Sequence, residues 1–383
     1  MALDLGRVRR SLSTRDGDLT FGQRILGFRW LMLLLLAALV AIGVATLYSA
    51  GRGSFSPWAD RQLLRFGVGL TALVVVALTD FRIWLRFAYA IYGVGLLLLV
   101  AVETIGTTAM GAQRWLDLGP VNIQPSELMK IAMVLALARY FHGLTLEAVA
   151  RPHYLIPPLL MVFAPAILVM KQPDLGTALT LVLGGGAMFY LAGVRMWKFA
   201  LVIAGALAAM PFLWERLRDY QKRRILMFLN PESDPLGAGY HIIQSKIALG
   251  SGGIFGKGFM QGTQSHLNFL PEKQTDFIFT MLAEEWGMVG GVFLLLLYAA
   301  VLGYGFALAV RIRHQFGRLV AMGIVNIMFI YVFVNIGMVM GVLPVVGIPL
   351  PLISYGGSAM LTLMAGFGLL IGAYIHREAP LGT

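Results

Sequence analysis

Long uncharged runs of hydrophobic residues recur along the chain and alternate with short polar or basic stretches. The first run, from Trp30 to Ser49, is long enough to cross the hydrocarbon core of a bilayer as an α-helix, which takes about 20 residues. The same pattern predicts nine further spans, which are Leu63–Leu78, Phe87–Val102, Pro125–Phe141, Tyr154–Met170, Leu175–Leu191, Phe199–Phe212, Phe277–Ala307, Leu319–Val339 and Tyr355–Ile375. We therefore expect an all-α integral membrane protein with about ten transmembrane helices.

The composition excludes a soluble fold. Of the 383 residues, 58% are hydrophobic and 13% are charged, against about 25% charged in an average globular domain. A formal net charge of +11 could suit nucleic acid, but the mean hydropathy of +0.78 favours a membrane, where cytoplasmic loops collect Lys and Arg. The absence of cysteine excludes disulfides, zinc ribbons and thiol catalysis.

The positions of the basic residues predict that both termini are cytoplasmic. Of the 30 Lys and Arg residues, 16 fall on the N-terminal side of the membrane, and the short loops on the other side hold five. The expected division is a basic cytoplasmic segment 1–29, one membrane domain 30–376 and a cytoplasmic tail 377–383. Segment 1–29 has six arginines and no clear cleavage site, so we expect the first span to be retained.

One long outer loop, about residues 214–275, carries eight basic residues. This charge could attract anionic head groups or could bind a phosphorylated lipid substrate. The pattern predicts interfacial helices at Trp214–Leu229 and Tyr240–Leu249. The glycine-rich run after them surrounds Lys257 but lacks the Gly-Lys-Ser/Thr ending of a nucleotide-binding P-loop, which argues against ATP binding.

Ionisable residues at membrane depth are costly, so each is a candidate functional residue. Glu127 and Lys130 share one helix face and can form either a structural ion pair or the floor of a polar cavity. Asp174 follows a tight turn, where it could cap a helix or face the same cavity. At least one of Glu284 and Glu285 should point into the protein rather than towards lipid.

Asp276 lies where the basic loop turns into a hydrophobic helix. It could simply cap that helix, or it could act as a general base that meets a lipid-linked sugar phosphate. The segment from Gly341 to Ser358 is too rich in Pro and Gly to be a continuous helix, so at membrane depth it must be covered by protein or line a cavity. It offers the hydroxyl groups of Ser354 and Tyr355, and it would also suit a transporter with broken helices.

Four separated runs of the sequence resemble the SEDS family of bacterial cell-wall polymerases. They are LPEKQTDFIFTMLAEEWG from Leu270, GVLPVVGIPLPLISYGGS from Gly341, QPSELMKI from Gln124 and KQPDLGT from Lys171. The likeness covers nearly the whole chain from the first span onward. It is closer to the rod-shape branch, RodA, than to the division branch, FtsW.

The resemblance implies an enzyme that polymerises peptidoglycan strands from lipid II on the outer face of the cytoplasmic membrane, in cell elongation. By the family motif Asp276 is the essential aspartate, and Glu127 and Lys130 shape the cavity. Lys273 and Gln274 stand where many relatives have Arg or Ala followed by His. Any assistance that this histidine gives to the aspartate is therefore missing here.

The expected mechanism has Asp276 take the proton of the acceptor 4-hydroxyl, which gives a β-1,4 linkage by inversion. Cations should stabilise the leaving pyrophosphate. The family suggests that Mg²⁺ or Mn²⁺ could share this role, although the sequence shows no ligand cluster. The other residues expected to bind substrate are Arg223, Arg224, Lys257, Lys273, Arg114, Asp174 and Ser354.

The resemblance also implies partners. We expect a class B penicillin-binding transpeptidase and other membrane proteins of an elongation complex, and no nucleic acid. Three alternatives stay open, namely a lipid II flippase or other lipid transporter, a division-specific polymerase of the FtsW type, and a noncatalytic scaffold.

Overall fold

The computed structural model describes residues 20–109, 112–117, 119, 122–216, 219–230, 238–267, 269 and 272–379. Ten of its helices correspond to the ten predicted spans: α3 (Trp30–Ala50), α4 (Ala59–Leu78), α5 (Phe81–Ile105), α6 (Pro125–His142), α8 (Ile156–Lys171), α9 (Leu175–Leu191), α10 (Met196–Arg216), α14 (Ile278–Val310), α15 (Gln315–Val339) and α16 (Gly357–Ile375). The prediction of an all-α membrane protein is confirmed.

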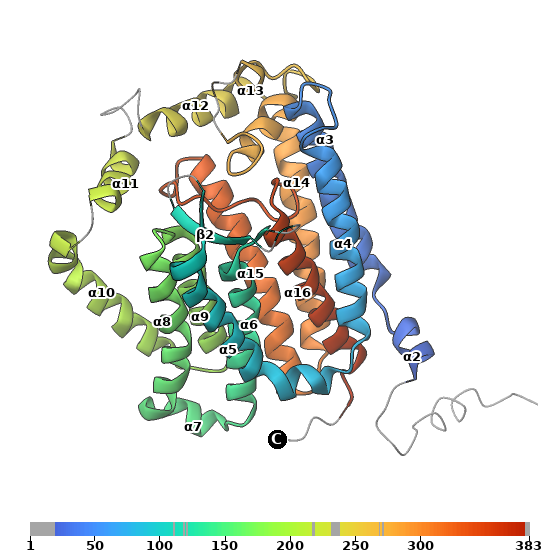
Figure 1. Cartoon of the computed structure of the whole chain (residues 1–383), viewed down its shortest axis with the longest axis vertical. Helices are drawn as coiled ribbons and strands as arrows, with labels where there is room; N and C mark the ends of the chain where they lie inside the picture. The colour runs from blue at the N-terminus through green and yellow to red at the C-terminus, as the bar shows by residue number, and fades with distance from the viewer. Residues whose placement is uncertain are drawn as a thin grey trace, which may run out of the picture.

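Among the described residues, seven helical segments are long enough and apolar enough to cross a membrane. They are α3, α4, α5, residues 152–171 (which contain α8), α14, α15 and α16. Helices α9 and α10 are apolar but shorter in their hydrophobic part, and α6 contains Glu127, Lys130 and Arg139. The number of ten spans therefore stays a prediction. In Figure 1 the described N-terminal helix α2 (Phe21–Leu26) and the C-terminal end of α16 lie at the same end of the bundle, as an even number of crossings requires.

Helices α15 and α16 form the centre of the bundle, because most of their residues are buried. Helices α4 and α5 lie at the periphery, and most of their hydrophobic residues are exposed or half-buried there, where a bilayer would cover them. The loop ends of several helices are defined by caps. Asp80 begins α5 by accepting a hydrogen bond from the backbone N–H of Arg82 at 2.9 Å.

The described part of the long loop folds into short helices at the opposite end of the molecule from the C-terminal end of α16 (Figure 1). These are α11 (Asp219–Leu229), α12 (Ala238–Ser251) and α13 (Thr263–His266). The two helices predicted in this loop are confirmed, with the difference that Trp214 belongs to the end of α10. In Figure 1, α10 and α11 lie at the side of the bundle, away from α14 and α16.

Three smaller features were not predicted. A three-stranded antiparallel sheet connects α5 to α6 and consists of β1 (Thr107–Ala109), β2 (Ala112–Asp117) and β3 (Asn122–Ile123). Helix α7 (Leu146–Ala150) and the 3₁₀-helix η1 (Pro152–Leu155) precede α8. The sheet places Arg114 beside the tight turn that precedes α9.

Candidate active site

Asp276 lies in a tight turn, residues 272–277, immediately before α14. The turn is closed by backbone hydrogen bonds from Thr275 and Phe277 to the carbonyl oxygen of Glu272, at 3.0 and 3.4 Å. The Glu272 carboxylate also accepts a hydrogen bond from the Thr275 hydroxyl at 3.1 Å. Glu272 itself has a φ of +52°, which costs free energy for a residue other than glycine and marks a turn fixed by its surroundings.

The Pro- and Gly-rich segment before α16 binds this turn through Ser354 and Tyr355. Ser354 Oγ donates a hydrogen bond to the carbonyl oxygen of Thr275 at 2.6 Å and accepts one from the backbone N–H of Leu350 at 2.7 Å. The backbone N–H of Tyr355 donates to the carbonyl oxygen of Gln274 at 2.8 Å. Ser354 is buried and its hydroxyl is used within the protein. It therefore holds the turn.

A third contact comes from Asn335, near the C-terminal end of α15. Its side-chain Nδ2 donates to the carbonyl oxygens of Asp276 and Ile348, at 2.9 and 2.7 Å. The half-buried Asp276 carboxylate points towards Gly347, where an added Cβ atom would lie 3.4 Å from Oδ2. Gly347 has a φ of +73°, a conformation that glycine adopts at little cost. The backbone of the turn is thus fixed at three successive carbonyl groups.

A cavity of about 680 Å³ with both polar and apolar lining residues lies beside the turn, between α4, the start of α16 and the sheet. Thr275 and Tyr355 line it from the side of the turn, and Arg65 lines it from α4. It shares Val68, Leu361 and other residues with a second cavity of about 660 Å³. The two cavities are therefore neighbours along α4 and α16.

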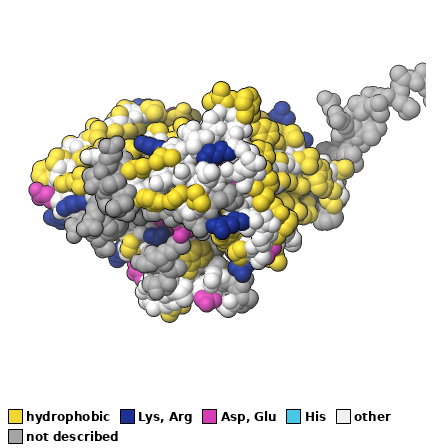
Figure 2. All heavy atoms as spheres, turned by 90° about the horizontal axis from the view of Figure 1, so that it is seen from above, with side chains coloured by type: hydrophobic (Ala, Val, Ile, Leu, Met, Phe, Trp, Pro, Cys, Tyr) yellow, Lys and Arg dark blue, Asp and Glu magenta, His cyan; other side chains and the backbone are white. Residues whose placement is uncertain are grey.

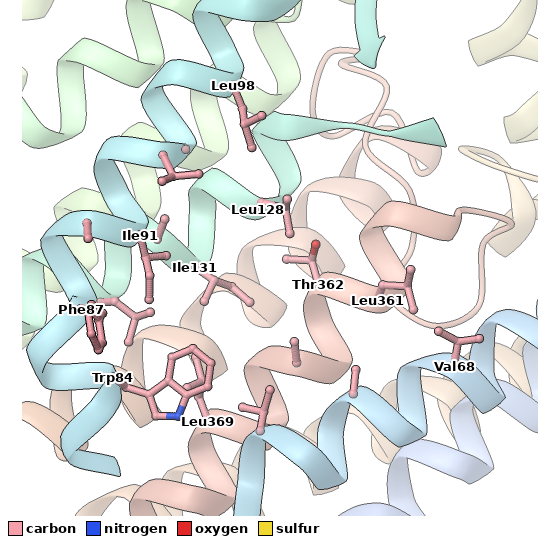
Figure 3. A pocket seen from close by; sticks show the side chains of 18 residues that line it. Val68, Trp84, Phe87, Ile91, Leu98, Leu128, Ile131, Leu361, Thr362 and Leu369 are labelled. Atoms are coloured by element: carbon pink, nitrogen blue, oxygen red, sulfur yellow. The ribbon is translucent and has the colours of Figure 1, made fainter. Parts of the chain in front are cut away.

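The second cavity is apolar. Figure 3 shows Val68, Phe87, Ile91 and Leu128 around it, contributed by α4, α5 and α6, with further side chains from α16. Thr362 supplies the one hydroxyl group among the lining side chains. A cavity of this kind at the periphery of the bundle suits a hydrocarbon chain.

Glu127 and Lys130 form a buried ion pair at 2.6 Å on the first turns of α6. Tyr331 of α15 donates its hydroxyl hydrogen bond to the Glu127 carboxylate, 3.0 Å from both oxygens, and its ring lies 4.3 Å from Lys130 Nζ. The predicted pairing is confirmed. A space of about 10 Å³, enough for about one water molecule, adjoins the pair.

Asp174 caps α9, as predicted, by accepting hydrogen bonds from the backbone N–H of Thr177 at 3.1 Å and from its hydroxyl at 2.9 Å. Arg114 Nε lies 3.8 Å from Asp174 Oδ2, and its Nη2 donates to the carbonyl oxygen of Pro173 at 2.5 Å. Arg114 and Asp174 thus join the sheet to the turn before α9, on the same side of the molecule as Asp276.

The cations of the long loop are in different situations. Lys257 pairs with Glu284 at 2.7 Å, and that fully buried carboxylate also accepts a hydrogen bond from the backbone N–H of Gln264 at 2.9 Å. Lys273 is buried, and both its burial and the nearby Arg52 lower the pKa of its ammonium group. The side chains of the remaining two predicted cations lie outside the described residues; these are Arg223 and Arg224.

Glu285, next to Glu284, is also buried and accepts a hydrogen bond from Ser49 of α3. Both carboxylates therefore face the protein interior. Gly252 and Gly256 allow the loop to lie against this part of α14, because a Cβ atom at either position would come within 2.2 Å of a backbone carbonyl oxygen. The loop is thereby fixed to the helix that begins after Asp276.

Figure 2 shows that Lys and Arg side chains are spread over the end of the molecule seen from above, rather than gathered in one patch. Among the described residues, no group of three or more His, Asp or Glu side chains could hold a metal ion. The described residues therefore do not fit a divalent cation bound by protein ligands alone.

Sequence analysis missed Asn335, Tyr331 and Arg65 as parts of this site. Asn335 and Tyr331 are polar groups inside a predicted span, and an asparagine at that depth is a signal that could have been used. Arg65 lies in the predicted span Leu63–Leu78, but the sequence alone does not indicate that it lines a cavity.

Comparisons with known proteins agree with the motifs. The model of the FtsW, RodA and SpoVE family, described as cell cycle proteins, matches residues 24–379. Peptidoglycan glycosyltransferase MrdB of Escherichia coli K12 is 47% identical over 91% of this chain and 93% of its own length. Stage V sporulation protein E of Bacillus subtilis is 36% identical over 89% of this chain and 95% of its own length.

Two solved structures are also similar. One, from work on a peptidoglycan synthase complex that coordinates polymerization and crosslinking, has a TM-score of 0.80 and 34% identity over 92% of this chain and 99% of its own. RodA of Thermus thermophilus has a TM-score of 0.70 and 32% identity over 92% of this chain and 98% of its own. Its structure was also solved as an aspartate-to-alanine mutant. The resemblance found in the motifs is confirmed, and the chain belongs to the FtsW, RodA and SpoVE family.

Proposed function

We propose that this chain is a peptidoglycan glycosyltransferase that polymerises lipid II into β-1,4-linked glycan strands, in cell elongation and shape maintenance. The observation that carries the proposal is the fixed turn at Asp276, whose backbone is held at three successive carbonyls while its carboxylate stays half-buried beside a cavity. Relatives at 47% and 32% identity are named peptidoglycan glycosyltransferases, which supports this reading.

In the proposed reaction the Asp276 carboxylate accepts the proton of the acceptor 4-hydroxyl. The hydroxyl oxygen forms a bond to the anomeric carbon of the donor, and the bond from that carbon to the lipid pyrophosphate breaks with inversion. A general base contributes about 10²- to 10⁴-fold to such a step. Fixing the backbone on both sides of the base helps to hold the carboxylate in position for this proton transfer.

The other predicted residues have supporting roles in this proposal. Arg223, Arg224 and Lys273 supply positive charge for a pyrophosphate, whereas Lys257 and Arg114, which pair with carboxylates, fix the loop and the sheet around the substrate. The Glu127–Lys130 pair shapes the floor of the cavity. Asp174 and Ser354 position backbone segments. No step is assigned to a metal ion.

The proposed location is the bacterial cytoplasmic membrane, with both termini cytoplasmic and Asp276 facing outward. The excess of basic residues at the end that holds the C-terminus supports this orientation. A class B penicillin-binding transpeptidase is the proposed partner, together with other membrane proteins of an elongation complex. The similar structure from a synthase complex that combines polymerization with crosslinking supports the transpeptidase.

The test is Asp276→Asn in the purified, detergent-solubilised protein supplied with lipid II. We expect polymer formation, followed by gel electrophoresis of labelled glycan, to fall at least about 100-fold, with an unchanged melting temperature. Glu103→Gln removes an exposed outer carboxylate and should keep full activity. Polymerisation by Asp276→Asn at the normal rate, or translocation of labelled lipid II without any polymer from the unmodified chain, would overturn the proposal.

A further inference from the structure

A third cavity, of about 440 Å³, lies between the first turns of α5 and the last turn of α6. This is the end of the bundle that holds the C-terminal end of α16, opposite the end at which α14 begins (Figure 1). Arg82, Arg86 and Arg139 line the cavity, and none of its described lining residues is acidic. We propose that it binds the phosphate of an anionic phospholipid from the surrounding membrane.

Arg139 is a fixed part of the cavity wall. It is half-buried in the last turn of α6, and its Nη1 donates hydrogen bonds to the backbone carbonyl oxygens of Leu85 and Arg86 in α5. Its guanidinium carbon also lies 4.7 Å from the centre of the Tyr89 ring. Because these contacts hold the guanidinium in place, an anion that binds there loses little free energy to the ordering of this side chain.

Arg86 supplies a second charge at the edge of the cavity. Its side chain is exposed, and it follows Arg82 by one turn of α5. Asp80, which precedes α5, uses its carboxylate to cap that helix and does not line the cavity. A phosphodiester oxygen that contacts Arg86 and Arg139 would form charge-assisted hydrogen bonds with both groups.

The outward side of α5 indicates that the phosphate belongs to a lipid. Leu97 and Val100 follow Arg86 by 11 and 14 residues, which are about three and four turns, so all three residues lie on one face of the helix. Leu97 is 71% exposed and Val100 is 45% exposed. A phospholipid with its phosphate at the arginines can therefore lay an acyl chain along this face.

This face of α5 is separate from the one that lines the apolar cavity of Figure 3. Phe87 and Ile91 line that cavity, whereas Arg82 and Tyr89 line the one between α5 and α6. At about 100° per residue, the two sets lie on nearly opposite sides of the helix. The phospholipid would thus join α5 to α6 without entering the cavities beside Asp276.

The experiment uses the full chain in phosphatidylcholine nanodiscs that contain a phosphatidylglycerol probe with a photoreactive group near its phosphate. Crosslinked peptides are identified by mass spectrometry. We expect crosslinks in the first turns of α5 and the last turn of α6, with a yield about fivefold higher than for a phosphatidylcholine probe of the same design. The yield should fall about fivefold in Arg86→Met and at least about tenfold when Arg139→Met is added.

The matched control is Arg195→Met. Arg195 is exposed between α9 and α10, on the side predicted to be cytoplasmic, and it does not line the cavity. Its removal should leave the yield unchanged, and Arg86→Lys should keep most of the yield because the charge remains. Equal yields from Arg86→Met and the unmodified chain would overturn the proposal. Equal losses in Arg86→Met and Arg195→Met would do so too, since general surface charge would then attract the probe.

Competitors distinguish a lipid from a soluble phosphate. Unlabelled phosphatidylglycerol should displace the probe, whereas inorganic phosphate and glycerol 3-phosphate should act no better than sodium chloride at the same ionic strength. Displacement by glycerol 3-phosphate as effective as that by phosphatidylglycerol would overturn the assignment to a lipid. Asp276→Asn should crosslink normally, so this result does not depend on the proposed function.

Discussion

The Asp276 turn and the Glu127–Lys130 pair each place a carboxylate close to the start of a helix, but the two carboxylates lie in different environments. Glu127 is 5% exposed, and its carboxylate forms an ion pair with Lys130 and accepts hydrogen bonding from the Tyr331 hydroxyl. At Asp276, the Asn335 side chain donates a hydrogen bond to the backbone carbonyl oxygen, and the residue is half-buried. The two carboxylates therefore differ in burial, because Glu127 is enclosed with its cation whereas Asp276 lies on a braced turn and is partly exposed.

This difference separates positioning from chemistry. A carboxylate buried with its cation cannot change its protonation state without leaving the other charge unpaired, which is costly. A half-buried carboxylate on a fixed turn remains accessible to a substrate. Both motifs belong to the family resemblance, and in the proposed function Asp276 is the base and Glu127 and Lys130 are a positioning pair.

The largest expected effect on stability comes from breaking the pair. Glu127→Gln leaves Lys130 as an unpaired buried charge, and Lys130→Met leaves Glu127 in the same situation. Each should destabilise the protein by about 3–5 kcal/mol, seen as a lower melting temperature in detergent. The double variant has no buried charge at this place and should recover most of the loss.

The double variant also tests the assigned role. It should polymerise lipid II at least about tenfold more slowly than the unmodified chain, because small displacements in a substrate cavity are costly for catalysis. Additive losses of stability in the double variant would contradict the coupling of the pair. Full activity of a stable double variant would show that the pair serves the fold alone.

Much of this contrast could be predicted from the sequence, because both carboxylates stand out against apolar surroundings. The i, i+3 spacing of Glu127 and Lys130 predicts their contact, and the position of Asp276 predicts a helix start. The contacts from Asn335 and Ser354 could not be predicted, because they join segments about 60 and 80 residues away in the chain and depend on how a non-helical segment folds.

The contacts of the basic residues could not be predicted from the sequence either. Charge and topology place Lys257 and Arg114 on the outer side, but no local pattern indicates that each pairs with a carboxylate from another segment. For Arg65 the limit is different, because its charge indicates only the outer side of the membrane, whereas in the structure it lines a cavity. Helix ends could be placed only to within a few residues, as the earlier start of α4 shows.

A smaller effect is expected from Ser354→Ala, which removes a brace from the Asp276 turn. The change leaves the Thr275 carbonyl and the Leu350 N–H without their partner, which should cost about 1–3 kcal/mol of stability. Polymerisation should fall about tenfold at temperatures where the variant is folded, because the base is less well fixed.

The matched control for this prediction is Ser251→Ala. Ser251 is exposed, and its hydroxyl bonds only to the Ala248 carbonyl within α12. Its removal should change stability by no more than about 0.5 kcal/mol and should leave activity intact. If Ser354→Ala behaved like this control, the turn would not depend on the segment before α16, and the comparison with the Glu127–Lys130 pair would fail.

The smallest expected effect concerns how stability depends on pH, which His314 should influence independently of catalysis at Asp276. His314 lies in the turn between α14 and α15, at the opposite end of α14 from Asp276, and caps α15 by accepting a hydrogen bond from the Gly317 N–H at 3.0 Å. Burial lowers the pKa of its imidazole from 6.5 to about 4; a backbone hydrogen bond with His376 opposes this shift, and the nearby His142 and Arg318 add to it. The folded protein therefore resists protonation of His314 that the unfolded chain accepts.

Stability should consequently be highest above pH 6.5 and should decrease as the pH falls from 6.5 to about 4, since the unfolded chain binds the extra proton first. His314→Asn keeps a capping side chain that does not titrate, so its melting temperature should depend less steeply on pH in this range. Some dependence should remain, because burial also lowers the pKa of His376. Asp276→Asn should retain the full dependence while it abolishes polymerisation. An equally steep profile for His314→Asn would contradict the assignment, whereas the expected result shows that acid sensitivity of the fold arises far from the proposed base.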